Sequence, residues 1–290
     1  MFLEAFTFPD ADAEHAFFMR KRANCYTSFY PYQTLCTRLS RLDFEPITVL
    51  SGSNGSGKST ALNVIAEKLR LKRRSAYNKT DFFMDYVDAC TAVQSETIPT
   101  QSCILTSDDV FDYMLDLRHV NDRIDTSRDS VFDEYYRLRS SGEYSDFRFE
   151  GMEDYDKLKR LNAARKQTVS KFTRRSLPKN VRTHSNGETA LHLFAEVIKD
   201  GGLYLLDEPE NSLSPAKQLE LAAYIEASAL SFGCQFILST HSLFFLSLRR
   251  AKVYDFDENP VDVKPWQELE VAKTYFDFFK EHESEFEQEW

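Results

Sequence analysis

A glycine-rich stretch at residues 52–60, GSNGSGKST, carries the clearest chemical signal in the sequence. It fits the pattern GxxxxGK[ST], in which backbone N–H groups line a concavity for phosphate, the lysine reaches the β- and γ-phosphates and a hydroxyl binds magnesium. The apolar run Ile47–Leu50 before it predicts a strand, and apolar positions three and four apart after it predict a helix. We therefore predict a site for a nucleoside triphosphate with Mg²⁺. Its residues are Gly52, Ser53, Asn54, Gly55, Ser56, Gly57, Lys58, Ser59 and Thr60.

Two adjacent carboxylates follow a second apolar run, in GGLYLLDEPE at residues 201–210. The segment Leu203–Leu206 has no polar alternation, which is typical of a parallel strand buried on both faces. Asp207 at its end can hold magnesium beside Ser59, and Glu208 can orient or deprotonate an attacking water. The alternative is a capping Asp-Glu pair before Pro209.

A histidine follows a third apolar run, in ILSTHSLFF. Taken alone, His241 could be a structural residue, but it comes just after the predicted buried strand Gln235–Ser239. At the end of such a strand a histidine can reach the γ-phosphate or the attacking water. We predict that His241 is a catalytic residue that senses the γ-phosphate, together with Glu208 and Lys58.

The stretch HSNGE at residues 184–188 marks the start of a helix. Ser185 precedes Glu188 by three residues, which is the spacing of a capping box. A helix N-terminus with free N–H groups is also suited to an incoming phosphate.

Together these motifs resemble the ABC-class ATPases, in which a Ser-Gly-Gly-Gln signature contacts the γ-phosphate held by the other subunit. Ser185 matches the serine and Gly187 the second glycine, whereas His184 and Asn186 depart from the pattern. The resemblance covers roughly residues 40–70 and 183–257. Within the class, DEPENSLSP is similar to the bacterial ATPases related to the SMC, recombination-repair and overcoming-lysogenization groups.

This resemblance implies an α/β fold, a P-loop NTPase of the ABC ATPase type, with a helical insertion between the P-loop and the signature. It further implies ATP and Mg²⁺ as ligands and a homodimer with composite ATP sites, in which Ser185 and Gly187 complete the partner's site. ATP hydrolysis would open and close that dimer for an effector protein of a DNA-associated or anti-phage system. The alternatives are the ATPase subunit of a membrane transporter, a P-loop kinase and an ATP-binding scaffold.

The pattern of the chain predicts three parts: residues 1–106 with the P-loop, a helical insertion at 107–175, and 176–290 with the signature and a C-terminal helix. The insertion reads as amphipathic helices from Ser107 to about Arg139 and a further helix over 154–172. Ser214 is predicted as the N-cap of a helix with Pro215 at its first position. A last strand is predicted over 251–257.

Two contacts expected in such a site have several candidates. The magnesium-sensing residue is Gln94, Gln101 or Asp108. The adenine contact is Tyr30, Tyr32 or Arg22.

The formal net charge of −10 argues against a surface made throughout for nucleic acid. The segment 157–182 nevertheless carries ten Lys or Arg and no acidic residue. It is a solvated helix face or a partner for the acidic stretch 107–156, a nucleic-acid contact, or a source of an arginine for bound ATP. In the acidic tail 266–290, packing of the aromatic residues on the protein's own core is favoured over docking of a partner.

The first residues lack the basic region and long apolar core of a signal peptide, and no run of about 18 apolar residues suggests a membrane span. We therefore expect a cytoplasmic protein without membrane insertion. The five cysteines contain no CxxC pair, which favours buried free thiols over a zinc or redox site.

Overall fold

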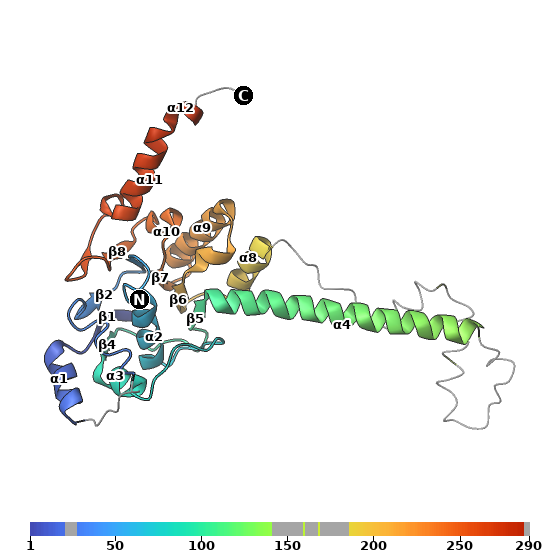
Figure 1. The fold of residues 1–290 in the computed structure, drawn as a ribbon, viewed down its shortest axis with the longest axis horizontal. Coiled ribbons are helices and arrows are strands. Elements are labelled where there is room, and N and C mark those ends of the chain that lie inside the picture. Colours follow the sequence, from blue (N-terminus) through green and yellow to red (C-terminus); the bar gives the residue numbers. More distant parts are fainter. Residues whose placement is uncertain (21–27, 141–158, 160–167, 169–185, 287–290) are drawn as a thin grey trace. The chain divides into compact units, whose positions relative to one another are not determined.

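The computed structural model describes residues 1–20, 28–140, 159, 168 and 186–286. The chain divides into two compact units, 1–111 with 185–290 and 112–184. The first unit holds both β-sheets (Figure 1). The boundaries 107–175 of the helical insertion stay a prediction.

The central sheet has six strands in the order β5-β6-β7-β3-β8-β9. Their bounds are β3 Ile47–Ser51, β5 Cys103–Thr106, β6 Leu203–Asp207, β7 Gln235–Ser239, β8 Lys252–Asp255 and β9 Asp262–Val263. All neighbouring pairs are parallel except β8 and β9. The residues of β3 and β7 are all buried, as their continuous apolar runs predicted. The predicted α/β fold with a parallel sheet is confirmed.

Helices connect and cover these strands. The helix after the P-loop is α2, Lys58–Lys68, which packs against β6 and β7. The helix α9, Pro215–Ser231, also packs against β7, and α8, Asn186–Val197, packs against α9. Ser214 is the N-cap of α9 as predicted, although its side chain makes no capping hydrogen bond. The short α10, Leu243–Leu246, lies near β3.

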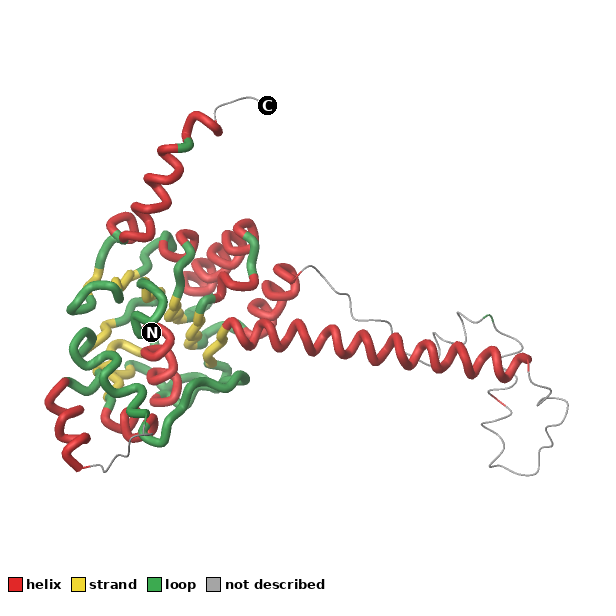
Figure 2. The backbone as a smooth tube through the Cα atoms, viewed as in Figure 1, coloured by secondary structure: helices red, strands yellow, loops and turns green. Residues whose placement is uncertain are grey.

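A second, antiparallel sheet has the order β2-β1-β4, with β1 Leu3–Thr7, β2 Arg41–Asp43 and β4 Thr91–Gln94. The helices α1, Ala11–Arg20, and α3, Phe83–Ala89, come from the same N-terminal stretch of sequence as these three strands (Figure 1), and the helices and strands are drawn in separate colours in Figure 2. The buried side chain of Gln235 joins the two sheets: its Oε1 accepts from the N–H groups of Phe2 and Leu3 at 2.9 Å, and its Nε2 donates to the carbonyl of Leu3 at 2.7 Å. This pairing satisfies a polar side chain in the core.

The amphipathic pattern after residue 107 forms one continuous helix, α4, Ser107–Ser140, of 34 residues. The predicted helix over 154–172, almost all of the basic segment 157–182, and Ser185 lie outside the described residues. Those predictions therefore stay predictions.

The C-terminal segment contradicts the expectation that its aromatic residues pack on the core. It consists of the short helix η3, Trp266–Glu268, then α11, Glu270–Glu281, and α12, Glu283–Phe286. Leu269 and Ala272 are buried, but five aromatic residues beyond them are exposed. These are Tyr275, Phe276, Phe278, Phe279 and Phe286. Among the described residues of α11, Ala272 in the first turn is buried, whereas the aromatic side chains of the later turns are exposed.

Cys90, Cys103 and Cys234 are free and buried, as predicted. Cys36 is free but only half-buried, and Cys25 lies outside the described residues. In the described part of the chain, no helix is both long enough and apolar enough to cross a membrane.

Candidate functional site

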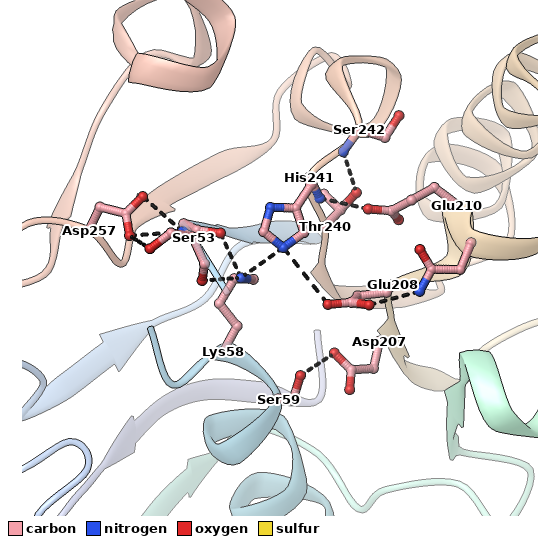
Figure 3. A network of polar contacts seen from close by, with 12 residues as sticks. Ser53, Lys58, Ser59, Asp207, Glu208, Glu210, Thr240, His241, Ser242 and Asp257 are labelled. Carbon is pink, nitrogen blue, oxygen red and sulfur yellow. Dashed lines mark hydrogen bonds and ion pairs between the residues drawn. The ribbon is translucent and has the colours of Figure 1, made fainter. Parts of the chain in front are cut away.

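The chemically distinctive residues gather at one edge of the central sheet, where parallel strands end. The P-loop follows β3, Asp207 and Glu208 end β6, and His241 follows β7 (Figure 3). In the register of the sheet, Leu50 of β3 and Asp207 of β6 both pair with Ser239 of β7. The three strands therefore end side by side. Carboxyl ends of parallel strands are where ligands bind in open α/β sheets.

Two glycines of the P-loop are required by their conformation and surroundings. Gly52 has φ +149°, and a Cβ there would lie 2.9 Å from Cβ of Phe256. Gly57 has φ +101°, and a Cβ there would lie 2.7 Å from Cδ2 of Leu35. Any side chain would therefore be strained and would clash at both positions. Gly57 also caps α2, so the loop leads directly into the N-terminus of that helix.

Lys58 is the best-buried cation of the site, with 4% of its surface exposed. Its Nζ donates to the carbonyl oxygens of Gly52 at 2.6 Å and Ser53 at 3.0 Å. It also lies 3.2 Å from Nε2 of His241. Burial lowers the pKa of Lys58, opposed by the carboxylates of Glu208, Asp257, Asp207 and Glu210. An anion brought beside this ammonium would favour its charged form.

Asp207 lies next to the hydroxyl that opens α2. The Oγ of Ser59 donates to Oδ1 of Asp207 at 2.9 Å. Burial raises the pKa of Asp207 to about 6, so its negative charge is poorly compensated by the surrounding protein. An oxygen pair of this kind fits Mg²⁺, which prefers oxygen ligands and keeps waters or phosphates in its other positions. Among the described residues, no group of three or more His, Cys, Asp or Glu side chains is placed to hold a metal ion, so Mg²⁺ at this point would need phosphate or water as further ligands.

Glu208 has an unusual backbone for a residue with a side chain. Its φ of 48° and ψ of 54° place it in the left-handed region, a conformation that costs free energy and is found at functional sites. Its N–H donates to the carbonyl of Ser239 at 2.9 Å, and its Oε2 accepts from Nδ2 of Asn211 at 2.8 Å. These contacts orient the carboxylate so that its other oxygen, Oε1, faces Lys58 and His241 (Figure 3).

His241 is held beside Glu208 through its backbone. The N–H of His241 donates to Oε1 of Glu210 at 2.6 Å. Its Nε2 lies 3.8 Å from Oε1 of Glu208. The ring therefore stands between the lysine of the P-loop and the carboxylate after β6. Glu210 was not predicted from the sequence, although it stands in the same DEPE motif.

Asp257, which follows β8, is a second residue that sequence reasoning missed. Its carboxylate accepts from the N–H of Ser53 at 2.8 and 2.9 Å and from Oγ of Ser53 at 2.6 Å. Burial alone would raise the pKa of Asp257, but the hydrogen bonds from Ser53 hold it below its ordinary value. Its own N–H donates to Oδ1 of Asp255 at 3.0 Å. Asp257 thus fixes the first turn of the P-loop.

We expect Asp257→Ala to weaken binding of an ATP analogue by roughly tenfold to a hundredfold, because hydrogen bonds to a charged group contribute about 1.5–3 kcal/mol. A fluorescence titration with and without Mg²⁺ measures this. Asp262→Ala is the matched control, since Asp262 is an exposed carboxylate that accepts a hydrogen bond from the N–H of the neighbouring Val263. Equal affinities of Asp257→Ala and the control would remove Asp257 from the site.

A cavity of about 670 Å³ opens beside the P-loop. Ser51, Gly52, Ser53 and His241 form one side, and the other side comes from the segment after β8 and from the start of α11. The cavity therefore lies against the His241 side of the P-loop.

The other predicted residues are distributed as follows. Gly187, in the first turn of α8, lies beside Ser212 and Ser214, the loop after the DEPE motif. Ser185 is outside the described residues. Thr60 accepts a hydrogen bond from the hydroxyl of Tyr30 at 3.2 Å. Asn54, Gly55 and Ser56 complete the loop between β3 and α2.

The positions of the candidates for magnesium sensing and adenine contact show which of them lie at the edge of the sheet that carries the site. Gln101 donates to the carbonyls of Asp200 and Gly201 at the opposite end of the sheet, so its candidacy was wrong. Gln94 is exposed in the antiparallel sheet, whereas Asp108 follows β5 at the edge that carries the site. Tyr32 is buried and stacked on Phe17 with ring centroids 4.2 Å apart. Arg22 is outside the described residues.

A parallel sheet in which one strand leads through a GxxxxGK[ST] loop into a helix, with the Asp-Glu pair and the histidine after neighbouring strands, is the arrangement of a P-loop NTPase. A family model described as "AAA domain, putative AbiEii toxin, Type IV TA system" matches residues 102–247. The chain belongs to this AAA-domain family.

Solved structures with a related arrangement include two SMC head domains. The one from Pyrococcus furiosus, bound to the C-terminal domain of ScpA, is 13% identical, with 97% of this chain and 99% of that chain covered and a TM-score of 0.43. The one from Thermotoga maritima is 12% identical, with 91% and 99% covered and a TM-score of 0.39. A dimeric bacterial ABC transporter cassette is 14% identical, with 81% and 93% covered and a TM-score of 0.38. No curated protein matches the chain.

Proposed function

We propose that this protein binds MgATP at the P-loop and hydrolyses it to ADP and phosphate. The observation that carries the proposal is the meeting of Lys58, Glu208 and His241 at the ends of three adjacent strands, with Nζ of Lys58 3.2 Å from Nε2 of His241 and Oε1 of Glu208 3.8 Å from the same atom. A P-loop lysine, a carboxylate and a histidine converging on one point can bind a γ-phosphate and position a water against it.

In this mechanism the backbone N–H groups of the P-loop and the N-terminus of α2 bind the phosphates, and Lys58 exchanges its contacts with two carbonyls for phosphate oxygens. Ser59 and Asp207 hold Mg²⁺, which neutralises charge on the phosphates when bound. Glu208, oriented by Asn211, positions the water and accepts its proton. His241 donates to or senses the γ-phosphate.

We further propose that ATP closes two copies head to tail, with Ser185 and Gly187 of one copy contacting the nucleotide of the other. Gly187 supports this because it lies in the first turn of α8, where free N–H groups suit a phosphate. Hydrolysis would then reopen the dimer, and the resulting motion would act on an effector. The family description refers to a toxin of a type IV TA system, which favours a defence system as the setting of this motion. The basic segment 157–182 is the proposed contact for a nucleic-acid backbone.

The dimer is tested with the Glu208→Gln protein, which should retain MgATP. We expect MgATP to increase its association measured by light scattering, and Ser185→Arg in the same background to abolish that increase. A bulky cation at Ser185 disturbs only the site shared between copies, so binding of the ATP analogue to the P-loop should stay within about twofold. Ser130→Arg is the control, because Ser130 lies on α4 away from the P-loop in sequence and makes only a local hydrogen bond. Full association of Ser185→Arg would contradict the shared site.

A further inference from the structure

The helix α11 presents an apolar stripe to solvent. Tyr275, Phe276 and Phe279 follow Ala272 at spacings of three, four and seven residues, which places them on one face of a helix. Ala272 is buried, whereas Tyr275 is 47%, Phe276 66% and Phe279 50% exposed. The stripe therefore begins in contact with the core and continues into solvent.

Two further rings widen this stripe. Phe278 is 53% exposed and Phe286, in α12, is 71% exposed. The ring centroids of Phe278 and Phe279 lie 5.6 Å apart, and those of Phe279 and Phe286 lie 6.0 Å apart. Ring contacts thus join Phe278, Phe279 and Phe286, and helical spacing places Tyr275 and Phe276 on the same face as Phe279. We call these five residues the aromatic stripe: Tyr275, Phe276, Phe278, Phe279 and Phe286. Charged residues of α11 fall on the opposite face of the helix, namely Glu270, Lys273, Asp277, Lys280 and Glu281.

The area of the stripe is large for a monomer. At roughly 200 Å² for a whole Phe or Tyr side chain, the exposed parts of the five rings amount to about 600 Å², the upper end of what monomers expose in one apolar patch. Covering the same stripe on two copies buries about 1,100–1,200 Å² in total, which reaches the size of a specific interface. The total exceeds the roughly 1,000 Å² that separates specific interfaces from casual contacts and lies at the low end of the range for dimers.

We propose that the aromatic stripe is the contact between two copies of this chain, formed without nucleotide. A two-fold axis lets one stripe meet the same stripe of the other copy, which is the commonest arrangement in soluble oligomers. The charged face of α11 points away from such a contact, so no charge is buried in it. Burying unpaired polar groups in this contact would cost free energy. The only side-chain polar group of the five stripe residues is the hydroxyl of Tyr275.

The charge of this segment also argues against anionic lipid or nucleic acid as its partner. Residues 266–286 hold six acidic residues and two lysines, a net charge of −4. A negative segment is repelled by anionic lipid and by nucleic acid. Two like-charged copies repel each other weakly as well, so salt should strengthen the contact between them, because it screens that repulsion and leaves apolar burial intact.

The test is sedimentation velocity of the full chain without nucleotide at micromolar concentration. We expect the wild type to be a dimer and Phe276→Ser/Phe279→Ser to raise the dissociation constant at least a hundredfold, because buried aromatic anchors carry most of the affinity of an interface. Asp277→Ser/Lys280→Ser, on the charged face of the same helix, should dimerise as the wild type does. Raising NaCl from about 50 to 500 mM should leave the wild-type dimer unchanged or tighter. All four side chains are exposed, so equal melting temperatures verify that the variants fold.

A photo-crosslinking side chain at Phe278 gives an independent measurement. We expect its crosslink to join two copies through their C-terminal segments. A monomeric wild type, a dimer that survives Phe276→Ser/Phe279→Ser, or crosslinks only to other molecules would each overturn the proposal. Because nucleotide is absent throughout, such a failure leaves the proposed MgATP-driven association untouched. That association is measured separately by adding Glu208→Gln to the Phe276→Ser/Phe279→Ser protein, which should be a monomer without nucleotide and should associate when MgATP is added.

Discussion

Replacing Glu208 by glutamine is expected to lower the rate of ATP hydrolysis by a factor on the order of a hundred to a thousand while MgATP still binds. The carboxylate after β6 accepts a hydrogen bond from Asn211 and faces His241 and Lys58, where a water attacking the γ-phosphate would stand. Glutamine keeps the size and the contact with Asn211 but cannot accept the proton of that water. The left-handed backbone of Glu208 is unchanged by the substitution, so the loop should keep its form.

Phosphate release at saturating MgATP measures this effect, and binding of a fluorescent ATP analogue measures affinity. Glu220→Gln is the matched control, since Glu220 is a surface carboxylate of α9 paired with Lys217. Wild-type turnover by Glu208→Gln would exclude Glu208 from the chemistry. Loss of binding by Glu208→Gln would instead indicate that the residue holds the loop together.

Lys58→Ala should weaken nucleotide binding by roughly a hundredfold or more, since two charge-assisted hydrogen bonds to phosphate contribute together about 3 kcal/mol. Lys58 is 4% exposed and burial lowers its pKa, so the ligand-free protein gains little from this ammonium. We therefore expect the melting temperature of ligand-free Lys58→Ala to equal or exceed that of the wild type.

The stabilisation that MgATP gives to the wild type should be absent from Lys58→Ala, because it depends on binding to the native state alone. Thermal melts with and without MgATP give both quantities in one experiment. Lys72→Ala, at an exposed lysine outside the P-loop, is the control. An unchanged shift of the melting temperature in Lys58→Ala would place the nucleotide elsewhere.

The sequence predicted those parts of the fold in which a local pattern determines the structure. The strands β3, β6 and β7 are largely apolar runs, and β6 ends at a residue of the candidate site while β3 and β7 end one or two residues before one. Because parallel strands place their carboxyl ends on one edge, the neighbourhood of Lys58, Asp207 and His241 could be inferred before any coordinates. The antiparallel sheet was not predicted, since β2 has three residues and β4 four, too few for a clear alternation.

The supporting contacts of the site could not be predicted because they join distant parts of the chain. Asp257 reaches Ser53 across 204 positions, and only the pairing of β3 with β8 brings them together. Glu210 binds the backbone of His241 through a similar long-range contact. For the aromatic residues of α11 and α12 the sequence led to a wrong prediction. Their composition suggested burial, but a helix buries its apolar face only if another element lies against it.

The most direct measurement follows the γ-phosphate when purified wild-type protein receives MgATP and no acceptor. If the residues at the sheet edge hydrolyse ATP, inorganic phosphate and ADP should appear in equal amounts over many turnovers, and both should fall together in Glu208→Gln. ADP without free phosphate would indicate transfer to the protein or to a bound acceptor, as in a kinase. No ADP above the level of Lys58→Ala, with tight MgATP binding intact, would contradict hydrolysis and leave an ATP-binding scaffold.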